Sequence, residues 1–357
     1  MRRLRHRKNT GRTKIAFHLG ISFCKSLYNR KIIEGFFMLD YSQNKSLYKD
    51  KSKTVSTDLR APFKWAGSKN RMFKRYMASG FFTSEEPKYF VDLFAGTGIV
   101  SQWVMKNYPG IEIIINESCE ELINMYRSMQ NFYSDFEKEY KKHVASYASY
   151  YTPDDRKKHY YSLRDKYALN YQGMTPAEEG ATLFYLLQTG FNGIWQTSKN
   201  FNWRYATAAG VMTWKPNGDL FDLAKIKRYA EFIRKCKLNT GDFEKLKSHA
   251  GKDTWFYADP PYRVSRAKYE SSGVFGSEDH QRLIDFANLA HSKGSLIAMS
   301  NREDVCFGLG EEPKTITRGF FADKFNNDWN VNYFDVKYTA GRHNKGAKGK
   351  EVLIKNY

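Results

Sequence analysis

The sequence predicts an α/β protein built on a mostly parallel sheet, and three segments indicate this. Residues 87–108, PKYFVDLFAGTGIVSQWVMKNY, have the pattern of a strand, a glycine turn and an amphipathic helix. A second strand pattern follows at residues 111–117, IEIIINE, and another ends in residues 254–262, TWFYADPPY. Strands that alternate with helices favour parallel pairing, which places ligands at the carboxyl ends of the strands.

The remaining segments complete this pattern. Residues 278–294 are typical of a helix and residues 295–301 of a strand, and a last pair of strands is expected near 329–339 and 350–357. Residues 126–237 are rich in Tyr and Lys, and we expect a mainly helical subdomain there, with a hairpin near residues 191–205. Residues 61–125 and 238–357 would then form the two parts of the sheet domain.

Charge separates residues 1–60 from the rest. The 357-residue chain carries a net charge of +20, and residues 1–60 hold 15 Lys and Arg against 4 Asp and Glu. Such a field favours polyanions, nucleic acid before anionic membrane. We expect residues 1–60 to be a poorly ordered basic extension that adds non-specific phosphate affinity. A transit peptide and a start at Met38 are the alternatives.

Cysteine and histidine spacing indicates neither disulfides nor metal. The four cysteines form no CxxC pair, and the eight histidines show no ligand spacing, so we expect no metal and reduced thiols in a cytoplasmic protein. No apolar run reaches about 18 residues, which argues against a membrane span.

The glycine turn suggests a nucleotide-like cofactor. Gly96 and Gly98 lie between a strand and a helix, where they let a ligand approach the backbone. The third glycine of the dinucleotide fingerprint and the Gly-Lys-Ser/Thr of a P-loop are both missing. Glu117, 19 residues after Gly98, is placed to accept the hydroxyls of an adenosine ribose. A solvated carboxylate that caps a helix is the alternative for Glu117.

The tetrapeptide at residues 259–262, Asp-Pro-Pro-Tyr, adds the chemistry. Pro260 and Pro261 stiffen the backbone just after a buried strand. Asp259 and the carbonyl of Pro260 are two acceptors that could hold both amino hydrogens of an adenine N6, and Tyr262 could stack on the same base. An adenine inside a duplex must be flipped out to reach such a site. A methyl donor would lie in the neighbouring pocket; a plain proline-rich turn is the alternative.

Eight segments in order carry a resemblance to a known family. They are PFKWAGSK (62–69), DLFAGTG (92–98), NESCEELINMY (116–126), HYYSLRDKY (159–167), FNGIW (191–195), GDF (241–243), DPPY (259–262) and the terminal EVLIKNY. Together they resemble the Dam-type DNA adenine-N6 methyltransferases, including phage members. The resemblance covers residues 61–357.

The resemblance implies a fold, a cofactor and its residues. The fold would be a Rossmann-like S-adenosylmethionine-dependent methyltransferase sheet with an inserted target-recognition subdomain, at residues 126–237. Residues 259–262 would be catalytic. S-adenosyl-L-methionine would be held by Trp65, Lys69, Asp92, Phe94, Ala95, Gly96, Thr97, Gly98, Glu117, Asp242, Phe243, Asp259 and Tyr269. Plain core packing is the alternative for Trp65 and Phe243, and a loose phosphate contact for Lys69.

The resemblance also implies double-stranded DNA as partner, contacted by Lys69, Phe191, Asn192, Gly193, Gln196 and Arg204. Phe191 would wedge beside the flipped base. Family members that read GATC usually carry Arg where Gln196 stands and Pro where Arg204 stands, so GATC is not carried over. Residues 154–171 interleave basic and aromatic residues, which suits either DNA contact or a surface helix. We expect a monomer or weak dimer in a bacterial or phage-infected cell.

Three rival functions stay open from the sequence: methylation of RNA adenine, methylation of DNA cytosine N4, and a non-catalytic DNA-binding relic. The missing Pro-Cys nucleophile argues against cytosine C5 chemistry. An intact Asp259, Gly96 and Gly98 argue against the relic.

Overall fold

The computed structural model describes residues 61–210, 221–262, 275–305, 314–315, 324–325, 328–337 and 348–357. The expected basic extension, residues 1–60, lies outside these described residues. The described residues all belong to one compact unit, Thr54–Tyr357.

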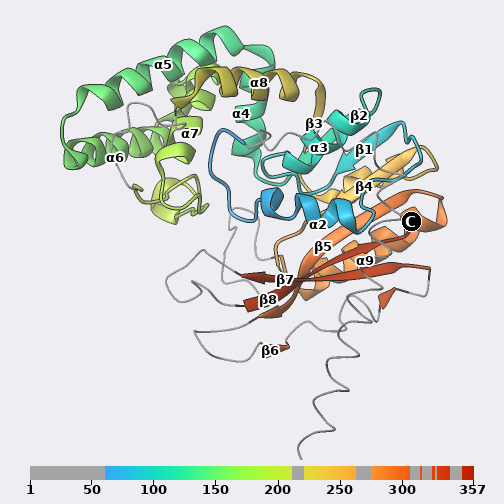
Figure 1. Cartoon of the computed structure of the whole chain (residues 1–357). Coiled ribbons are helices and arrows are strands. Elements are labelled where there is room, and N and C mark those ends of the chain that lie inside the picture. Colours follow the sequence, from blue (N-terminus) through green and yellow to red (C-terminus); the bar gives the residue numbers. More distant parts are fainter. Residues whose placement is uncertain are drawn as a thin grey trace, which may run out of the picture. The chain divides into compact units, whose positions relative to one another are not determined.

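A single sheet organises this unit, with the strand order β3-β2-β1-β4-β5-β8-β7 and β6 paired to β5 (Figure 1). Strands β1 to β5 run parallel, whereas β8 is antiparallel to both β5 and β7. This confirms the predicted mostly parallel α/β sheet and its terminal strand pair. The strands are β1 (Tyr89–Asp92), β2 (Glu112–Glu117), β3 (Cys236–Thr240), β4 (Thr254–Ala258), β5 (Leu296–Val305), β6 (Lys314–Thr315), β7 (Asn330–Lys337) and β8 (Lys348–Lys355).

The register of strand pairing aligns the carboxyl ends of the central strands β1 to β4. Asp92 at the end of β1 pairs with Ile115 of β2 and with Tyr257 of β4, and Glu117 at the end of β2 pairs with Thr240 of β3. β1 and β4 are buried over nearly their whole length, which explains their apolar and aromatic sequences. The segments that follow β1, β2, β3 and β4 therefore meet at one edge of the sheet.

Two helices pack on the sheet near its centre. α3 (Ile99–Asn107) connects β1 to β2, and α9 (Ser277–Ser292) precedes β5. The buried face of α9, with Leu283, Phe286 and Ala287, joins the apolar side chains of β4, β5 and β8 in one core cluster. This core fixes β4 and β5, whose ends carry much of the candidate site.

Between β2 and β3 the chain forms a set of helices (Figure 1). α7 is buried along almost its entire length and packs on α4, α5 and α6. A capping box starts α7: the Thr175 hydroxyl accepts from the Glu178 amide, and the Glu178 carboxylate accepts from the Thr175 amide. The helices are α4 (Glu120–Asn131), α5 (Tyr133–Ser149), α6 (Pro153–Leu169), α7 (Pro176–Thr189) and α8 (Leu223–Arg234).

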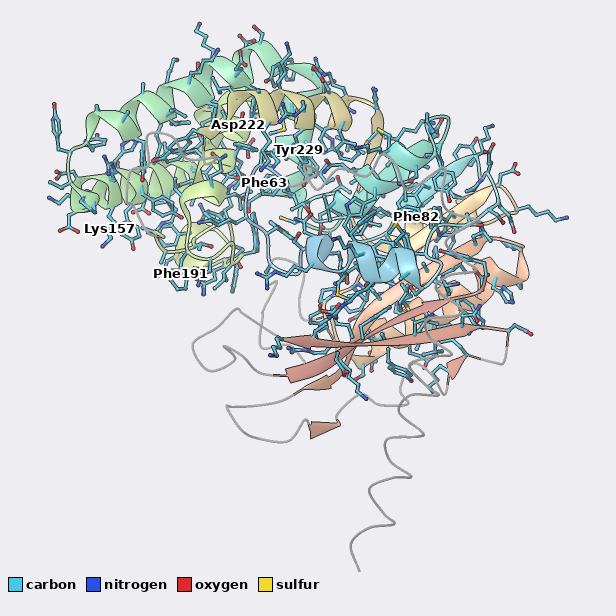
Figure 2. All side chains as sticks on the ribbon, in the orientation of Figure 1. Phe63, Phe82, Lys157, Phe191, Asp222 and Tyr229 are labelled. Atoms are coloured by element: carbon cyan, nitrogen blue, oxygen red, sulfur yellow. The ribbon has the colours of Figure 1, made fainter. Side chains whose placement is uncertain are left out.

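The segment before the sheet is anchored to these helices. The Phe63 ring lies 5.7 Å from the ring of Phe184 in α7 and 5.8 Å from that of Tyr229 in α8, and Figure 2 labels Phe63 and Tyr229 close together. Gln188 donates to the Pro62 carbonyl at 2.7 Å. The chain then forms a short 3-10 turn, η2 (Lys69–Arg71), and α2 (Phe73–Ala78). These contacts fix residues 62–69 beside the carboxyl edge of the sheet, where they line the cavity described next.

Candidate active site

A cavity of about 490 Å³ opens at the carboxyl edge of the sheet. Its size is within the range of small-molecule and cofactor sites. Most of the lining residues come from the ends of β1, β2, β3 and β4 and from residues 65–69. The lining includes every described residue expected to hold the cofactor except Gly98. Tyr269, the remaining one, lies outside the described residues.

The glycine turn after β1 needs its glycines. Gly96 and Gly98 have φ values of 49° and 63°, in the left-handed region that side chains disfavour. A Cβ on Gly96 would lie 2.9 Å from Nε1 of Trp65. Two buried tyrosines hold the turn from behind: Tyr126 donates to the Gly96 carbonyl at 2.5 Å, and Tyr229 donates to the Thr97 carbonyl at 2.9 Å.

Glu117 ties this turn to the end of β2. Its Oε2 accepts from the Gly96 amide at 3.0 Å, and its Oε1 accepts from the amides of Ser118 at 2.9 Å and Cys119 at 3.3 Å. Burial raises the pKa of this carboxyl above its ordinary value, and the three amides oppose that shift. The Ser118 hydroxyl also donates to Oε1 at 3.4 Å, so Oε1 is fully used. The Gly96 amide is the one donor to Oε2 among the described residues, so this oxygen keeps acceptor capacity for a ligand hydroxyl.

Asp92 presents a buried carboxylate oxygen at the cavity. The side chain is 1% exposed, and its Oδ2 accepts from the Ser101 hydroxyl at 2.8 Å. Its Oδ1 has no hydrogen-bond partner among the described residues. Burial raises the pKa of Asp92 to about 7. A buried acceptor without a partner is costly, and a cationic ligand group would satisfy it.

Asp242 and Phe243, which follow β3, form another part of the cavity wall. Asp242 caps the 3-10 turn η6 (Phe243–His249) by accepting from the Glu244 amide at 2.9 Å, and its Oδ1 also pairs with Arg282 at 2.9 Å. The Phe243 ring is 2% exposed and packs 5.4 Å from the Phe94 ring. Both residues line the cavity, and Phe243 also belongs to the apolar core cluster, so the packing expected as its alternative is present. Its cofactor contact stays a prediction.

The predicted catalytic tetrapeptide centres on a buried ion pair. Lys69 Nζ lies 2.7 Å from Asp259 Oδ1, and the Ser300 hydroxyl donates to the same oxygen at 2.9 Å. Burial acts to lower the pKa of Lys69, but the neighbouring Asp259 and Glu351 carboxylates outweigh it and hold this pKa well above its usual value. Burial raises the pKa of Asp259, and Lys69 opposes that rise. Both contacts fall on Oδ1, which leaves Oδ2 to accept from a substrate.

Tyr262 is held by the same cluster. Its hydroxyl accepts from Lys69 at 3.3 Å and donates to Glu351 Oε1 at 2.9 Å. The Lys69 ammonium lies 5.2 Å from the Tyr262 ring centre. Ring and carboxylate are therefore fixed relative to each other on either side of Pro260 and Pro261.

Sequence reasoning missed Ser300 and Glu351. Ser300 lies in β5 and Glu351 in β8, and both strands were expected. The register that brings their side chains to Asp259 and Tyr262 depends on pairing between distant segments, such as Ser300 with Leu353 and Arg302 with Glu351. No local pattern in the sequence reports it.

The expected hairpin contacts the cavity wall. Two isolated antiparallel bridges, Gly190 to Ala209 and Thr197 to Tyr205, close the segment of residues 190–209. Phe191, labelled in Figure 2, is 46% exposed. Asn192 and Gly193 follow with φ values of 53° and 68°. The Gly193 carbonyl accepts from the Ala66 amide at 3.0 Å, and a Cβ on Gly193 would lie 2.7 Å from Cβ of Lys64.

Two of the expected DNA-contacting residues have different surroundings. Gln196 is exposed, whereas the Arg204 side chain is only 13% exposed. Arg204 forms an ion pair with Glu179 of α7, lies 3.7 Å from a Glu121 oxygen of α4, and sits 3.7 Å from the ring centre of Tyr171. These contacts anchor the hairpin to the helices.

Comparison with known protein families shows which family this chain belongs to. Residues 65–329 match the D12 class N6 adenine-specific DNA methyltransferases. The chain belongs to this family. It is therefore an adenine-specific DNA methyltransferase with the α/β methyltransferase sheet, and the rival RNA, cytosine-N4 and relic functions are not favoured.

Several methyltransferases of known name are similar in sequence to this enzyme over most of its length. It is 25% identical over 259 residues to the type II methyltransferase M.MjaIII of Methanocaldococcus jannaschii, covering 69% of this chain and 86% of the relative. It is 25% identical over 315 residues to M1.LlaDCHI of Lactococcus lactis, covering 84% and 96%. The DNA adenine methylase of Haemophilus influenzae is 25% identical over 259 residues, covering 69% and 80%.

Among solved structures, the rRNA methyltransferase AviRa from Streptomyces viridochromogenes is similar at a TM-score of 0.32 and 10% identity, covering 87% of this chain and 96% of that chain. The strand order, not this weak likeness, establishes the fold of the enzyme. None of its described helices is long and apolar enough to cross a membrane. Its described residues include no group of three or more His, Cys, Asp or Glu side chains placed to bind a metal ion.

Proposed function

We propose that this methyltransferase transfers the methyl group of S-adenosylmethionine to N6 of an adenine flipped out of duplex DNA, with residues 259–262 as the catalytic centre. The single observation that carries the proposal is the position of Asp259. Asp259 and Pro260 both line the cavity, and one oxygen of the Asp259 carboxylate is fixed by Lys69 and Ser300.

The cavity fits the proposed cofactor. The unpartnered Asp92 oxygen suits the ammonium group of the methionine part, and Oε2 of Glu117 has acceptor capacity for a ribose hydroxyl. Trp65 and Phe243 offer apolar walls for an adenine ring. S-adenosylmethionine would supply an electrophilic methyl group on a sulfonium sulfur, so no covalent intermediate with the protein is needed.

Asp259 and the Pro260 carbonyl would accept the two hydrogens of the adenine amino group. This draws the N6 lone pair out of conjugation with the ring and directs it at the methyl carbon. The new bond joins N6 to carbon as the bond from carbon to sulfur breaks, and its electron pair stays on sulfur. N6 then loses one proton, for which the Asp259 carboxylate is the nearest base. Positioning and fixed charges supply the rate enhancement.

DNA recognition is proposed to involve the 190–209 hairpin. Lys69, also expected to contact DNA, is 3% exposed and paired with Asp259, so it supports the catalytic carboxylate and is not placed to bind a phosphate. Phe191 is exposed enough to wedge into the base stack, and Gln196 is exposed enough to reach a base edge. Arg204, held by Glu179 and Tyr171, supports the hairpin instead of reading a base. The recognition sequence is therefore expected to differ from GATC. Relatives named type II methyltransferases support a place in a modification system.

The test is methylation of unmodified genomic DNA by purified protein with S-adenosylmethionine, read by single-molecule sequencing for N6-methyladenine. One enriched motif that disappears with Asp259→Ala would support both the reaction and the catalytic assignment. Equal methylation by Asp259→Ala would remove Asp259 from the mechanism. Absence of N6-methyladenine despite cofactor binding would contradict the proposal.

A further inference from the structure

The hairpin carries a second large aromatic side chain that the expected DNA contacts do not include. Trp203 is 51% exposed. By contrast, four other tryptophans are buried, at 7% exposure or less: Trp103, Trp195, Trp255 and Trp329. Among the described residues the Trp203 ring makes no aromatic or cation–π contact, and about half of the side chain is open to solvent.

The backbone at Trp203 is strained in a way that a turn alone does not require. Asn202 and Trp203 have φ values of 53° and 57°. Asparagine tolerates the left-handed region, but a bulky residue there costs about 1–2 kcal/mol. Strain of this kind collects at functional sites, where the surrounding structure maintains it.

Neighbouring residues hold Trp203 in this position. Its amide donates to the Ser198 carbonyl at 2.9 Å, and the Arg204 amide donates to the Phe201 carbonyl at 2.9 Å. Arg204 is anchored by Glu179 and Tyr171, and Tyr205 is 1% exposed. The indole is thus presented from a fixed backbone, which lowers the entropy lost when a ligand binds it.

We propose that Trp203 is a second DNA-stacking residue of the hairpin, contacting a base of the duplex at a point separate from Phe191. The inference rests on the proposed function and deepens it. Phe191 adjoins the Gly190–Ala209 bridge, whereas Trp203 lies in the segment beyond the Thr197–Tyr205 bridge. Every base offers a flat face for stacking, and the exposed Lys199 nearby can pair with a phosphate.

The experiment measures DNA affinity of the full chain by fluorescence anisotropy, using a duplex that the wild-type enzyme methylates. Trp203→Ala is expected to weaken binding by about 5- to 150-fold, as for the loss of one stacked base. The slope of log Kd against log salt stays unchanged, because no charge is removed. Trp203→Phe keeps a stacking ring and most of the affinity.

Trp203→Asn separates binding from folding. Asparagine suits a φ of 57°, so this variant keeps or raises the melting temperature while it weakens DNA binding. The matched control is Tyr151→Ala, because Tyr151 is 95% exposed and lies between α5 and α6, outside the hairpin. This control is expected to bind DNA as the wild type does.

Two results would overturn the inference: a Kd for Trp203→Ala within about twofold of wild type, or weakening in Trp203→Asn matched by a lower melting temperature. Both presuppose a wild-type enzyme that binds and methylates the duplex. A wild type that binds no DNA contradicts the proposed function itself, so the two failures are distinguishable.

Discussion

At the scale of single residues, Lys69 and Asp259 show how burial and charge combine. Lys69 is 3% exposed, and a buried ammonium needs nearby carboxylates to remain charged. Asp259 provides one at 2.7 Å, and Glu351 is linked to the pair through the Tyr262 hydroxyl. The lysine in turn favours the ionised form of Asp259, the form that accepts hydrogens from an amino group.

Lys69→Met tests this pair. Without the ammonium, burial raises the pKa of Asp259 further, so a larger fraction is protonated at a given pH. We expect kcat to fall by about 100-fold or more, as for the loss of a charged group at a reacting centre. The acid limb of the plot of kcat/KM against pH should move to higher pH. Lys69→Arg keeps the charge and should retain the acid limb of the wild type. An unmoved acid limb in Lys69→Met would refute this role.

At the scale of elements, the turn between β1 and α3 joins sequence to geometry most directly. Its glycines were expected to let a ligand approach the backbone, and Gly96 and Gly98 do adopt positive φ. Trp65 comes from a segment far earlier in the chain, yet its indole covers Gly96. The turn therefore depends on two things: the positive φ values that its glycines allow, and the close approach of the Trp65 side chain to Gly96.

Gly96→Ala should weaken cofactor binding. The added Cβ would lie 2.9 Å from Trp65 Nε1 at a φ of 49°, so Trp65 or the turn must shift. Strain of about 1–2 kcal/mol predicts a roughly 5- to 30-fold higher Kd for S-adenosylmethionine by isothermal titration calorimetry. Gly110→Ala is the matched control, because a Cβ there meets nothing within 4 Å. Equal Kd values for the two variants would show that Gly96 is not needed.

The capping box of α7 gives a prediction about stability alone. Thr175→Ala removes the side chain that accepts from the Glu178 amide. The loss should be about 1 kcal/mol, or a melting temperature about 2–4 °C lower. Since Thr175 is not part of the lining of the active-site cavity, kcat and KM should be unchanged. A folded variant with a reduced kcat would contradict this separation and would link the packing of α7 to the reaction.

The sequence predicted the site residues that lie at the ends of predicted strands. Gly96, Glu117 and Asp259 each lie at or just after the end of a strand that the sequence predicts, and parallel pairing brings them to one edge. Asp242 follows β3, a strand that the sequence analysis did not predict, and only the family resemblance indicated this residue. Ser300 and Glu351 could not be found this way, because their approach depends on register between β5 and β8. The enclosure of Arg204 was also hidden, since its carboxylate partners lie 25 or more residues away in the sequence.

At the scale of the whole molecule, the net charge of +20 is the dominant property. More than half of it comes from residues 1–60, whereas the family match begins at residue 65. We expect the charge of this extension to act on DNA through the phosphates, independently of sequence. We therefore expect residues 1–60 to contribute to DNA affinity but not to the choice of DNA sequence, which should depend on the rest of the chain.

Replacing the seven Lys and Arg of residues 1–14 by Gln in the full chain tests this separation. We expect weaker binding at low salt and a shallower slope of log Kd against log salt, by about 0.9 for each phosphate that the extension no longer neutralises. The methylated motif and kcat at saturating DNA should be unchanged. A changed motif, read by sequencing, would instead assign base recognition to this region.

The position of residues 62–69 has a consequence for how accurately the enzyme selects its DNA sequence. This short segment contacts the hairpin through the hydrogen bond from the Ala66 amide to the Gly193 carbonyl, and it contacts the Asp259 carboxylate through Lys69. A hairpin displaced by a wrong base would shift the same segment that holds Asp259. Discrimination between DNA sequences would then be expressed in the rate of methyl transfer as well as in binding, so that a wrong site, even when occupied, is methylated slowly.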